Sequence, residues 1–193
     1  ARGGEAEARE RRLAAQLVRA LWRGAGGAAA ELLAPERHRV HGFALWANAA
    51  SQGEECAYHL DYAELHRRRQ GILHPPILAS TVHVTDFGSS GAAGGAMRGG
   101  EFGVNTQGLS HYLRFGHHGV LARADPAAFG RDWAGGEGWV KAGYRFRRAI
   151  LFDGELPHCA TPVEALPAAH LKRVVVGINV FDTDVGPHVA GAP

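Results

Sequence analysis

The sequence predicts a mainly β fold with flanking helices, in which short strands form a sandwich or a barrel. The length of 193 residues suits one compact domain, and the composition, 46% hydrophobic and 21% charged, is that of a globular protein. From residue 38 onward, short apolar runs alternate with turn residues, whereas helical spacing is confined mainly to the first 35 residues. We therefore expect a single domain over residues 1–193, with N-terminal helical support over residues 1–35 and a β core over about 38–182.

The first predicted element is a helix over residues 5–23. Leu13, Leu17 and Leu21 fall on one face at helical spacing, and Arg and Glu residues occupy the opposite face. Glycines from position 24 onward and Pro35 interrupt the helical pattern.

The elements that follow are short strands, together with two short helices expected over Tyr62–Arg69 and Gly108–Arg114. The glycine-rich stretch 88–100 is predicted to be a loop. The predicted strands are His38–Ala47, Ala57–Tyr62, Ile77–Thr85, Glu101–Val104, Gly119–Ala122, Trp139–Lys141, Arg145–Phe152, Cys159–Val163 and Leu171–Phe181.

Charge and composition bear on the class of partner. The net charge is +2 and the basic residues are scattered, so there is no strong nucleic-acid signal, and the arginines at 67–69 are interpreted as a solvated helix face. No run of 18 apolar residues exists, so we expect a soluble, intracellular protein with no membrane partner. Cys56 and Cys159 are too few for a disulfide framework, and we expect both to be small buried residues.

The sequence Tyr58-His59-Leu60-Asp61-Tyr62 contains the first candidate metal ligands. On a strand, residues two apart point to the same face, so the imidazole of His59 and the carboxylate of Asp61 converge. Held in this way, the two groups can occupy adjacent positions around one metal ion.

A third candidate ligand follows a predicted core strand. The apolar residues 149–152 lead into a turn, and His158 stands at the start of the next strand. Two histidines and one carboxylate on one triangular face leave three coordination positions open, an arrangement that suits non-haem Fe(II) oxygenases. We therefore expect His59, Asp61 and His158 to bind one metal ion.

A positive charge opens the last apolar strand, at Lys172 and Arg173. A charge that enters a core needs a partner, which a dicarboxylate ligand would supply. Successive strand residues face opposite ways, so only one of the two can point inward. Arg173 is the better candidate, because a guanidinium binds a carboxylate through two hydrogen bonds.

The order of these parts resembles the Fe(II)- and 2-oxoglutarate-dependent dioxygenase superfamily, most closely its prolyl 4-hydroxylase-like branch. The resemblance covers about residues 38–182, and aligning Asn179 on the family's last asparagine places Arg173 at the 2-oxoglutarate position. The matching parts, in chain order, are His59-Leu60-Asp61, the strand Thr81-Val82-His83-Val84-Thr85, Gly99-Gly100-Glu101-Phe102, Leu151-Phe152 leading to His158, and Arg173.

This resemblance implies a double-stranded β-helix, the jelly-roll core that cupins also have. It implies an oxidoreductase in which His59, Asp61 and His158 are the catalytic ligands of Fe(II) and Arg173 binds the co-substrate 2-oxoglutarate. An unidentified substrate would be hydroxylated with release of succinate and CO2, and ascorbate would be an additional cofactor. Because the halogenating relatives lack the carboxylate, Asp61 favours hydroxylation.

The substrate stays open: a protein side chain, a small molecule and a nucleobase all fit the resemblance. We expect specificity in the loops Phe87–Gly100 and Asn105–Gly119, the first of which is a candidate lid. The second segment does not match the family pattern, and neither do Val175 and Gly177. The alternatives are a non-catalytic binding module on the same scaffold and a zinc hydrolase with the same three ligands.

Other polar and aromatic residues have plainer interpretations. His83 is expected to be a core histidine rather than a neighbour of the metal, and the adjacent His117 and His118 are expected to lie in a loop. A tyrosine often assists 2-oxoglutarate binding in the family, but the four tyrosines are not distinguished by the sequence. The residues interpreted as sandwich core are Trp46, Trp139, Phe102 and Phe181.

Overall fold

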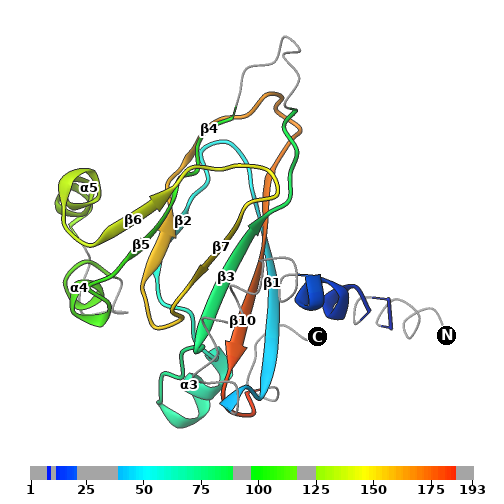
Figure 1. Ribbon diagram of the computed structural model, residues 1–193. Coiled ribbons are helices and arrows are strands. Elements are labelled where there is room, and N and C mark those ends of the chain that lie inside the picture. The colour runs from blue at the N-terminus through cyan, green and yellow to red at the C-terminus, as the bar shows by residue number, and fades with distance from the viewer. Residues whose placement is uncertain (1–7, 10–11, 21–38, 89–96, 117–124, 186–193) are drawn as a thin grey trace.

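The structure is a computed structural model that describes residues 8–9, 12–20, 39–88, 97–116 and 125–185. The described residues before position 21 are helical, in agreement with the predicted N-terminal helix. Most of the regular structure that follows is antiparallel β-sheet (Figure 1). The prediction of a mainly β fold with flanking helices is therefore confirmed for the described part of the chain.

Two four-stranded antiparallel sheets form the core. The first sheet has the order β1-β10-β3-β7, the second has the order β2-β8-β5-β6, and a separate two-stranded ladder joins β4 to β9. The strands are β1 Gly42–Ala50, β2 Cys56–His59, β3 Leu78–His83, β4 Arg98–Gly99, β5 Phe102–Asn105, β6 Trp139–Ala142, β7 Ala149–Phe152, β8 His158–Ala160, β9 Val163–Ala165 and β10 Arg173–Phe181.

The strand pairs are nested along the chain. Apart from β4 and β9, the first strand pairs with the last, β2 with β8, β3 with β7, and β5 with β6. These four antiparallel pairs fall alternately in the first and the second sheet, and further pairing of β10 with β3 and of β8 with β5 completes each sheet. The chain therefore crosses between the two sheets after almost every strand (Figure 1).

Strand β10 is an inner strand of the first sheet and pairs with β1 on one side and β3 on the other. Its β-branched residues suit an extended, buried strand. Val175, Ile178 and Val180 are each at most 5% exposed. Arg173, the candidate anion-binding residue, is the first residue of β10, so its backbone is fixed at one end of an inner strand.

Two helices, α4 Leu109–Phe115 and α5 Pro126–Gly135, lie beside the second sheet (Figure 1). Their aromatic side chains form a cluster with Tyr58 of β2 and Cys159 of β8. The face of the second sheet that carries Tyr58 and Cys159 is therefore covered by α4 and α5, and we call it the outer face.

The start of α5 follows from its sequence. The side chain of Asp125 accepts hydrogen bonds from the backbone N–H groups of Ala127 and Ala128. Pro126 occupies the first turn, where its missing N–H costs nothing. The shorter helix α3, Glu64–Gln70, ends at Gly71, which adopts the left-handed conformation at φ 70°.

The predicted strands that the structure describes all have somewhat different bounds. The first, predicted over His38–Ala47, is β1 Gly42–Ala50. The strand predicted to reach Tyr62 ends at His59, and the one predicted from Arg145 begins at Ala149. The run Cys159–Val163 is divided between β8 and β9, because Thr161 and Pro162 interrupt it.

Both short helices of the prediction are confirmed as α3 and α4, but α5 was not predicted. Two glycines, at 130 and 135, weaken its helical pattern, and only Asp125-Pro126 marks its start. The predicted strand Gly119–Ala122 lies outside the described residues, as does most of the predicted loop 88–100. At the described end of that loop the prediction is wrong, because Arg98–Gly99 form strand β4.

None of the helices within the described ranges is both long and apolar enough to cross a membrane.

Candidate metal centre

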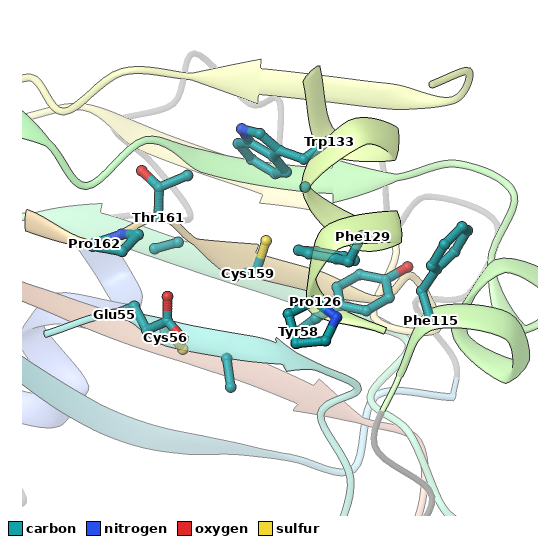
Figure 2. A pocket seen from close by; sticks show the side chains of 13 residues that line it. Glu55, Cys56, Tyr58, Phe115, Pro126, Phe129, Trp133, Cys159, Thr161 and Pro162 are labelled. Carbon is teal, nitrogen blue, oxygen red and sulfur yellow. The ribbon is translucent and has the colours of Figure 1, made fainter. Parts of the chain in front are cut away.

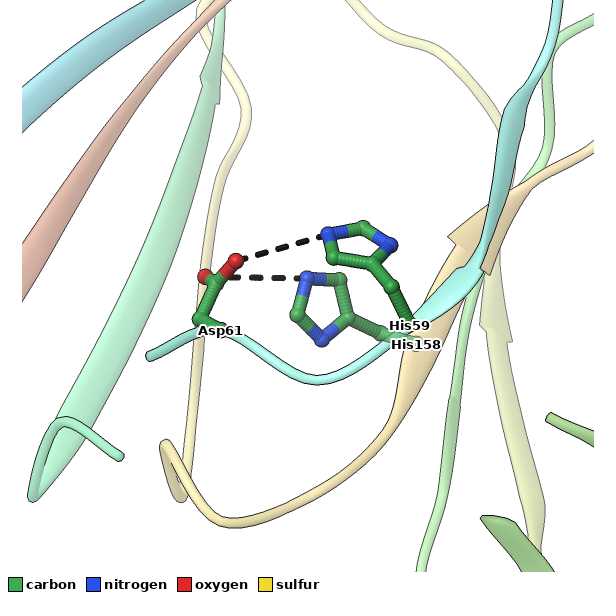
Figure 3. Close-up of side chains that lie close together, drawn as sticks. All are labelled: His59, Asp61 and His158. Carbon is green, nitrogen blue, oxygen red and sulfur yellow. Dashed lines mark ion pairs between the residues drawn. The ribbon is translucent and has the colours of Figure 1, made fainter. Parts of the chain in front are cut away.

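Three side chains from two distant parts of the chain meet between the two sheets (Figure 3). One ligand atom from each of His59, Asp61 and His158 lies within 4.8 Å of the others. The Nε2 atoms of the two histidines are 3.4 Å and 3.7 Å from the two oxygens of Asp61. The structure thus brings together the three residues that the sequence singled out as candidate ligands.

The two histidines are brought together by strand pairing. His59 is the last residue of β2, His158 is the first residue of β8, and the two are directly opposite in the ladder. Their ring centroids are 4.3 Å apart. Direct pairing across two strands explains why residues separated by 99 positions in the chain present their side chains to the same place.

Asp61 reaches the cluster differently from what strand alternation predicted. It lies two residues beyond the end of β2, so its position is not set by the ladder. Instead, Asn179 of β10 donates a hydrogen bond from Nδ2 to the Asp61 Oδ2, over 3.0 Å. The carboxylate is therefore held by a residue of the opposite sheet.

Both imidazoles are oriented by the same local contact. The Nδ1 of His59 lies 2.7 Å from the carbonyl oxygen of Ala57, and the Nδ1 of His158 lies 3.1 Å from that of Leu156. A carbonyl can only accept, so each Nδ1 carries the proton and donates. In a neutral imidazole this leaves Nε2 with its lone pair, which is the form that binds a metal.

The charges of the cluster are mutually dependent. Burial by itself acts to lower the pKa of His59 and to raise that of Asp61. The contacts of His59 with Asp61 and Cys56 outweigh burial and raise the pKa of His59 to about 10. The contacts of Asp61 with His59, His158 and Asn179 lower the pKa of its carboxyl. Burial and the neighbouring His59 lower the pKa of His158 to about 4. An anionic carboxylate beside a deeply buried neutral imidazole is a donor set that favours a divalent cation.

Arg173 is a buried cation with few hydrogen-bond partners. Its side chain is 3% exposed, and Nη1 donates a hydrogen bond of 3.0 Å to the carbonyl oxygen of Gly100. Its Nε is buried without a hydrogen-bond partner, and no carboxylate of the described residues forms an ion pair with it. Burial lowers its pKa, although arginine stays charged. A buried, unpaired guanidinium favours an anionic ligand.

The predicted choice between the two cations at the start of β10 is confirmed. Lys172 is exposed and Arg173 is buried, as alternation along a strand requires.

The Gly99-Gly100 pair makes room for this arginine. Both glycines adopt left-handed backbone conformations, at φ 71° and 64°. A Cβ at Gly100 would lie 3.1 Å from the Cδ of Arg173, closer than a side chain there can comfortably approach. The Gly-Gly-Glu motif therefore places a backbone carbonyl against Arg173 in a way that no other residue at position 100 could without strain.

One cavity between the sheets is lined by both candidate histidine ligands and by the arginine. Its lining includes His59 and His158 from the second sheet and Arg173, Trp46 and Thr81 from the first. The side chain of His59 is 36% exposed, against 14% for Asp61 and 3% for His158. Of the three ligand candidates, His59 is therefore the one most open to solvent.

Trp46 was interpreted as sandwich core, but it lines this cavity. Its indole lies so close to β10 that a Cβ at Gly177 would collide with it. Its Nε1 is buried and has no hydrogen-bond partner. The contact explains why glycine stands at position 177, and it adds a second unpaired donor near Arg173 that the sequence did not reveal.

His83 also lines the cavity, and it is a satisfied core histidine as expected. It is 1% exposed, accepts a 3.0 Å hydrogen bond from the N–H of Arg145 at Nδ1, and stacks on Tyr144 with ring centroids 4.3 Å apart. Burial lowers its pKa to about 4, so the ring is neutral near pH 7.

Two of the tyrosines are already committed to other partners. The hydroxyl of Tyr58 lies 2.8 Å from the Nδ1 of His111 on the outer face, and that of Tyr144 donates to the carbonyl of Thr85. Helix α4 also packs on the outer face, so the described part of the 105–119 segment lies away from the cavity, contrary to its predicted role at the mouth. His117 and His118 lie outside the described residues.

No known protein family matches the chain, and no curated protein matches it.

Proposed function

We propose that the protein is a dioxygenase that uses Fe(II) and 2-oxoglutarate to hydroxylate a substrate, with release of succinate and CO2. One observation carries the proposal: a buried guanidinium without a counter-charge, that of Arg173, lines the same cavity as two imidazoles of a His–Asp–His cluster. A metal site alone would fit many functions. Metal-ligand side chains and a buried arginine at one cavity suit, by their chemistry, a dicarboxylate that binds the metal at one end. The cavity has a volume of about 30 Å³, so the side chains that line it must move apart for such a ligand to enter.

The strand order supports a double-stranded β-helix, or jelly roll, as the core. The nested pairs, first with last and so on inward, are those of one long antiparallel hairpin. Winding such a hairpin so that successive pairs fall in alternate sheets produces an eight-stranded jelly roll. This fold places strand ends from both sheets around one central cavity, as the resemblance requires.

Each residue has a defined task in the proposal. His59, Asp61 and His158 would hold Fe(II) on one face and leave three positions open. Arg173 would bind the distal carboxylate of 2-oxoglutarate, using its unpaired Nε. The bound iron and co-substrate supply the oxidising chemistry, while the chain orients them and keeps water out of a cavity lined partly by Phe102 and Val175.

Binding and turnover of 2-oxoglutarate test the proposal. We expect Fe(II)-dependent formation of succinate, measured with and without ascorbate. We also expect the absorption that Fe(II) acquires when a 2-oxo acid chelates it without oxygen. Arg173→Gln should raise the KM for 2-oxoglutarate about 30-fold or more, because truncating one partner of a buried charged pair costs about 2–5 kcal/mol. Lys172→Gln, next to it but exposed, is the matched control and should behave like the wild type.

Two results would contradict the proposal. If 2-oxoglutarate binds equally well to both variants, Arg173 is not its anchor. If Zn²⁺ binds the three ligands and 2-oxoglutarate has no effect, a zinc hydrolase or a non-catalytic binding module is the better description. Once succinate formation is established, compounds that stimulate it identify the substrate among protein side chains, small molecules and nucleobases.

A further inference from the structure

A second cavity lies on the other side of the strands that carry the two histidines (Figure 2). Along β2 and β8, residues alternate between the two faces, so Tyr58 and Cys159 point outward while the neighbouring His59 and His158 point inward. The outward-facing side chains line a cavity of about 360 Å³ beneath α5. This volume is in the range of small-molecule sites, which runs from about 300 to 1,000 Å³.

The two ends of this outer cavity differ in chemistry. Figure 2 shows the rings of Tyr58, Phe115 and Phe129 gathered at one end, while Glu55 and Thr161 lie at the other. The aromatic end offers flat apolar surfaces that suit an aromatic ring. The polar end carries the carboxylate of Glu55 and the hydroxyl of Thr161, whose oxygens accept hydrogen bonds.

Most polar groups of the lining already have partners. The Tyr58 hydroxyl is bound to His111, and the Thr161 Oγ1 accepts a hydrogen bond from the N–H of Glu101. Burial raises the pKa of Cys159 to about 12, so its thiol is a neutral part of the floor. The carboxylate of Glu55 is the charged group of the lining, and none of the lining residues is Lys or Arg.

The adjacent helix contributes a glycine, residue 130, to the edge of this cavity. Gly130 lines the cavity, and a Cβ built there would meet nothing within 4 Å. Its backbone is helical, so neither a positive φ nor a close approach requires glycine. Glycine within a helix costs about 1 kcal/mol relative to alanine. A larger side chain at this position would therefore favour the helix and has space to extend beside the cavity.

We propose that this outer cavity binds a small aromatic amine, with its ring at the aromatic end and its ammonium group beside Glu55. The carboxylate of Glu55 favours the cationic group of the ligand, and the aromatic end of the cavity favours its ring. The outer cavity shares Cys56 and Ala160 with the inner one but is lined by none of the three metal-ligand candidates. The inference does not depend on the proposed dioxygenase activity.

Isothermal titration calorimetry with a matched pair of probes tests this inference on the full chain without added metal. Tryptamine and indole-3-acetate share a ring and differ in the sign of their charge. We expect tryptamine to bind at least about tenfold more tightly. Glu55→Gln should bring the two affinities to within about twofold of each other, because the carboxylate is then absent.

A second test fills the cavity with a larger side chain. Gly130→Leu should reduce tryptamine binding at least about tenfold, while thermal unfolding shows that the variant is folded. Gly135→Leu is the matched control, because residue 135 lies on the same helix, also has open space at its Cβ and does not line the cavity. Equal affinity of the wild type for both probes, or unchanged tryptamine binding in Gly130→Leu, would overturn the proposal.

Discussion

The two faces of the β2–β8 strand pair are built from opposite kinds of chemistry. On the inner face, His59 and His158 meet Asp61 in a cluster whose charges depend on one another. On the outer face, Tyr58 and Cys159 belong to an aromatic cluster that helices α4 and α5 cover. One pair of short strands therefore carries a cluster of ionisable side chains on one face, while its other face is packed against helices.

A chain of hydrogen bonds shows how the outer face is held. Tyr58 lies 2.8 Å from the Nδ1 of His111, whose Nε2 lies 2.7 Å from the carboxylate of Asp132. Trp139 donates to the same carboxylate over 2.9 Å. A carboxylate only accepts, so His111 donates at Nε2 and, as a neutral ring, accepts from Tyr58 at Nδ1. Burial raises the pKa of Tyr58, which keeps its hydroxyl protonated. The network joins β2, α4, α5 and β6.

The largest predicted effect is on metal affinity, and it distinguishes two adjacent residues that lie on opposite faces of β8. His158→Ala should lower the affinity for Fe(II) more than about 100-fold, beyond the 10–100-fold that loss of an outer hydrogen-bond partner causes, and should abolish succinate formation. Cys159→Ala, one residue further on the outer face, should keep the metal affinity of the wild type. Metal titration of both variants measures this difference, and equal losses in the two would show that the faces are not independent.

A smaller effect is expected from the outer network. His111→Phe should lower the free energy of unfolding by about 2–3 kcal/mol, because the Tyr58 hydroxyl and the Asp132 carboxylate each lose a buried partner. His170→Phe, at an exposed position, is the control and should change stability by less than about 0.5 kcal/mol. Urea unfolding compares the two. A loss as small as the control's would mean that the network does not hold the outer face.

The smallest predicted effect is a loss of stability at acid pH that His83, a residue lining the inner cavity, contributes. Burial lowers the pKa of His83 from 6.5 to about 4, so between these values the unfolded chain binds a proton that the folded protein does not. The stability contributed by neutral His83 is therefore complete above pH 6.5 and is lost as the pH falls toward 4. We expect a loss of about 1–2 kcal/mol from this group, allowing for partial screening by solvent.

Urea unfolding at pH 7 and pH 4.5 measures this loss. His83→Asn keeps an acceptor for the N–H of Arg145 but does not titrate, so its stability should fall less than that of the wild type over this interval. An identical pH dependence in the two proteins would exclude His83 as a contributor to acid instability.

Much of the fold could be predicted because it depends on local patterns. Alternation and short apolar runs located most strands, and alternation also identified Arg173 rather than Lys172 as the buried cation. Helix α5 could not be found in this way, because its glycines weaken the pattern and its packing on the outer face supplies the missing stability. Local propensity carries no information about such distant contacts.

The sequence by itself determined which residue types could form the metal cluster and in what order they occur. Only the tertiary structure decided how they meet: His59 opposite His158 in a ladder, and Asp61 held by Asn179 from the other sheet. It also decided that Trp46 lines the inner cavity and that a second cavity lies behind the two histidines. Pairing register and the packing of one sheet against another join residues far apart in the chain, and no local pattern encodes those distances.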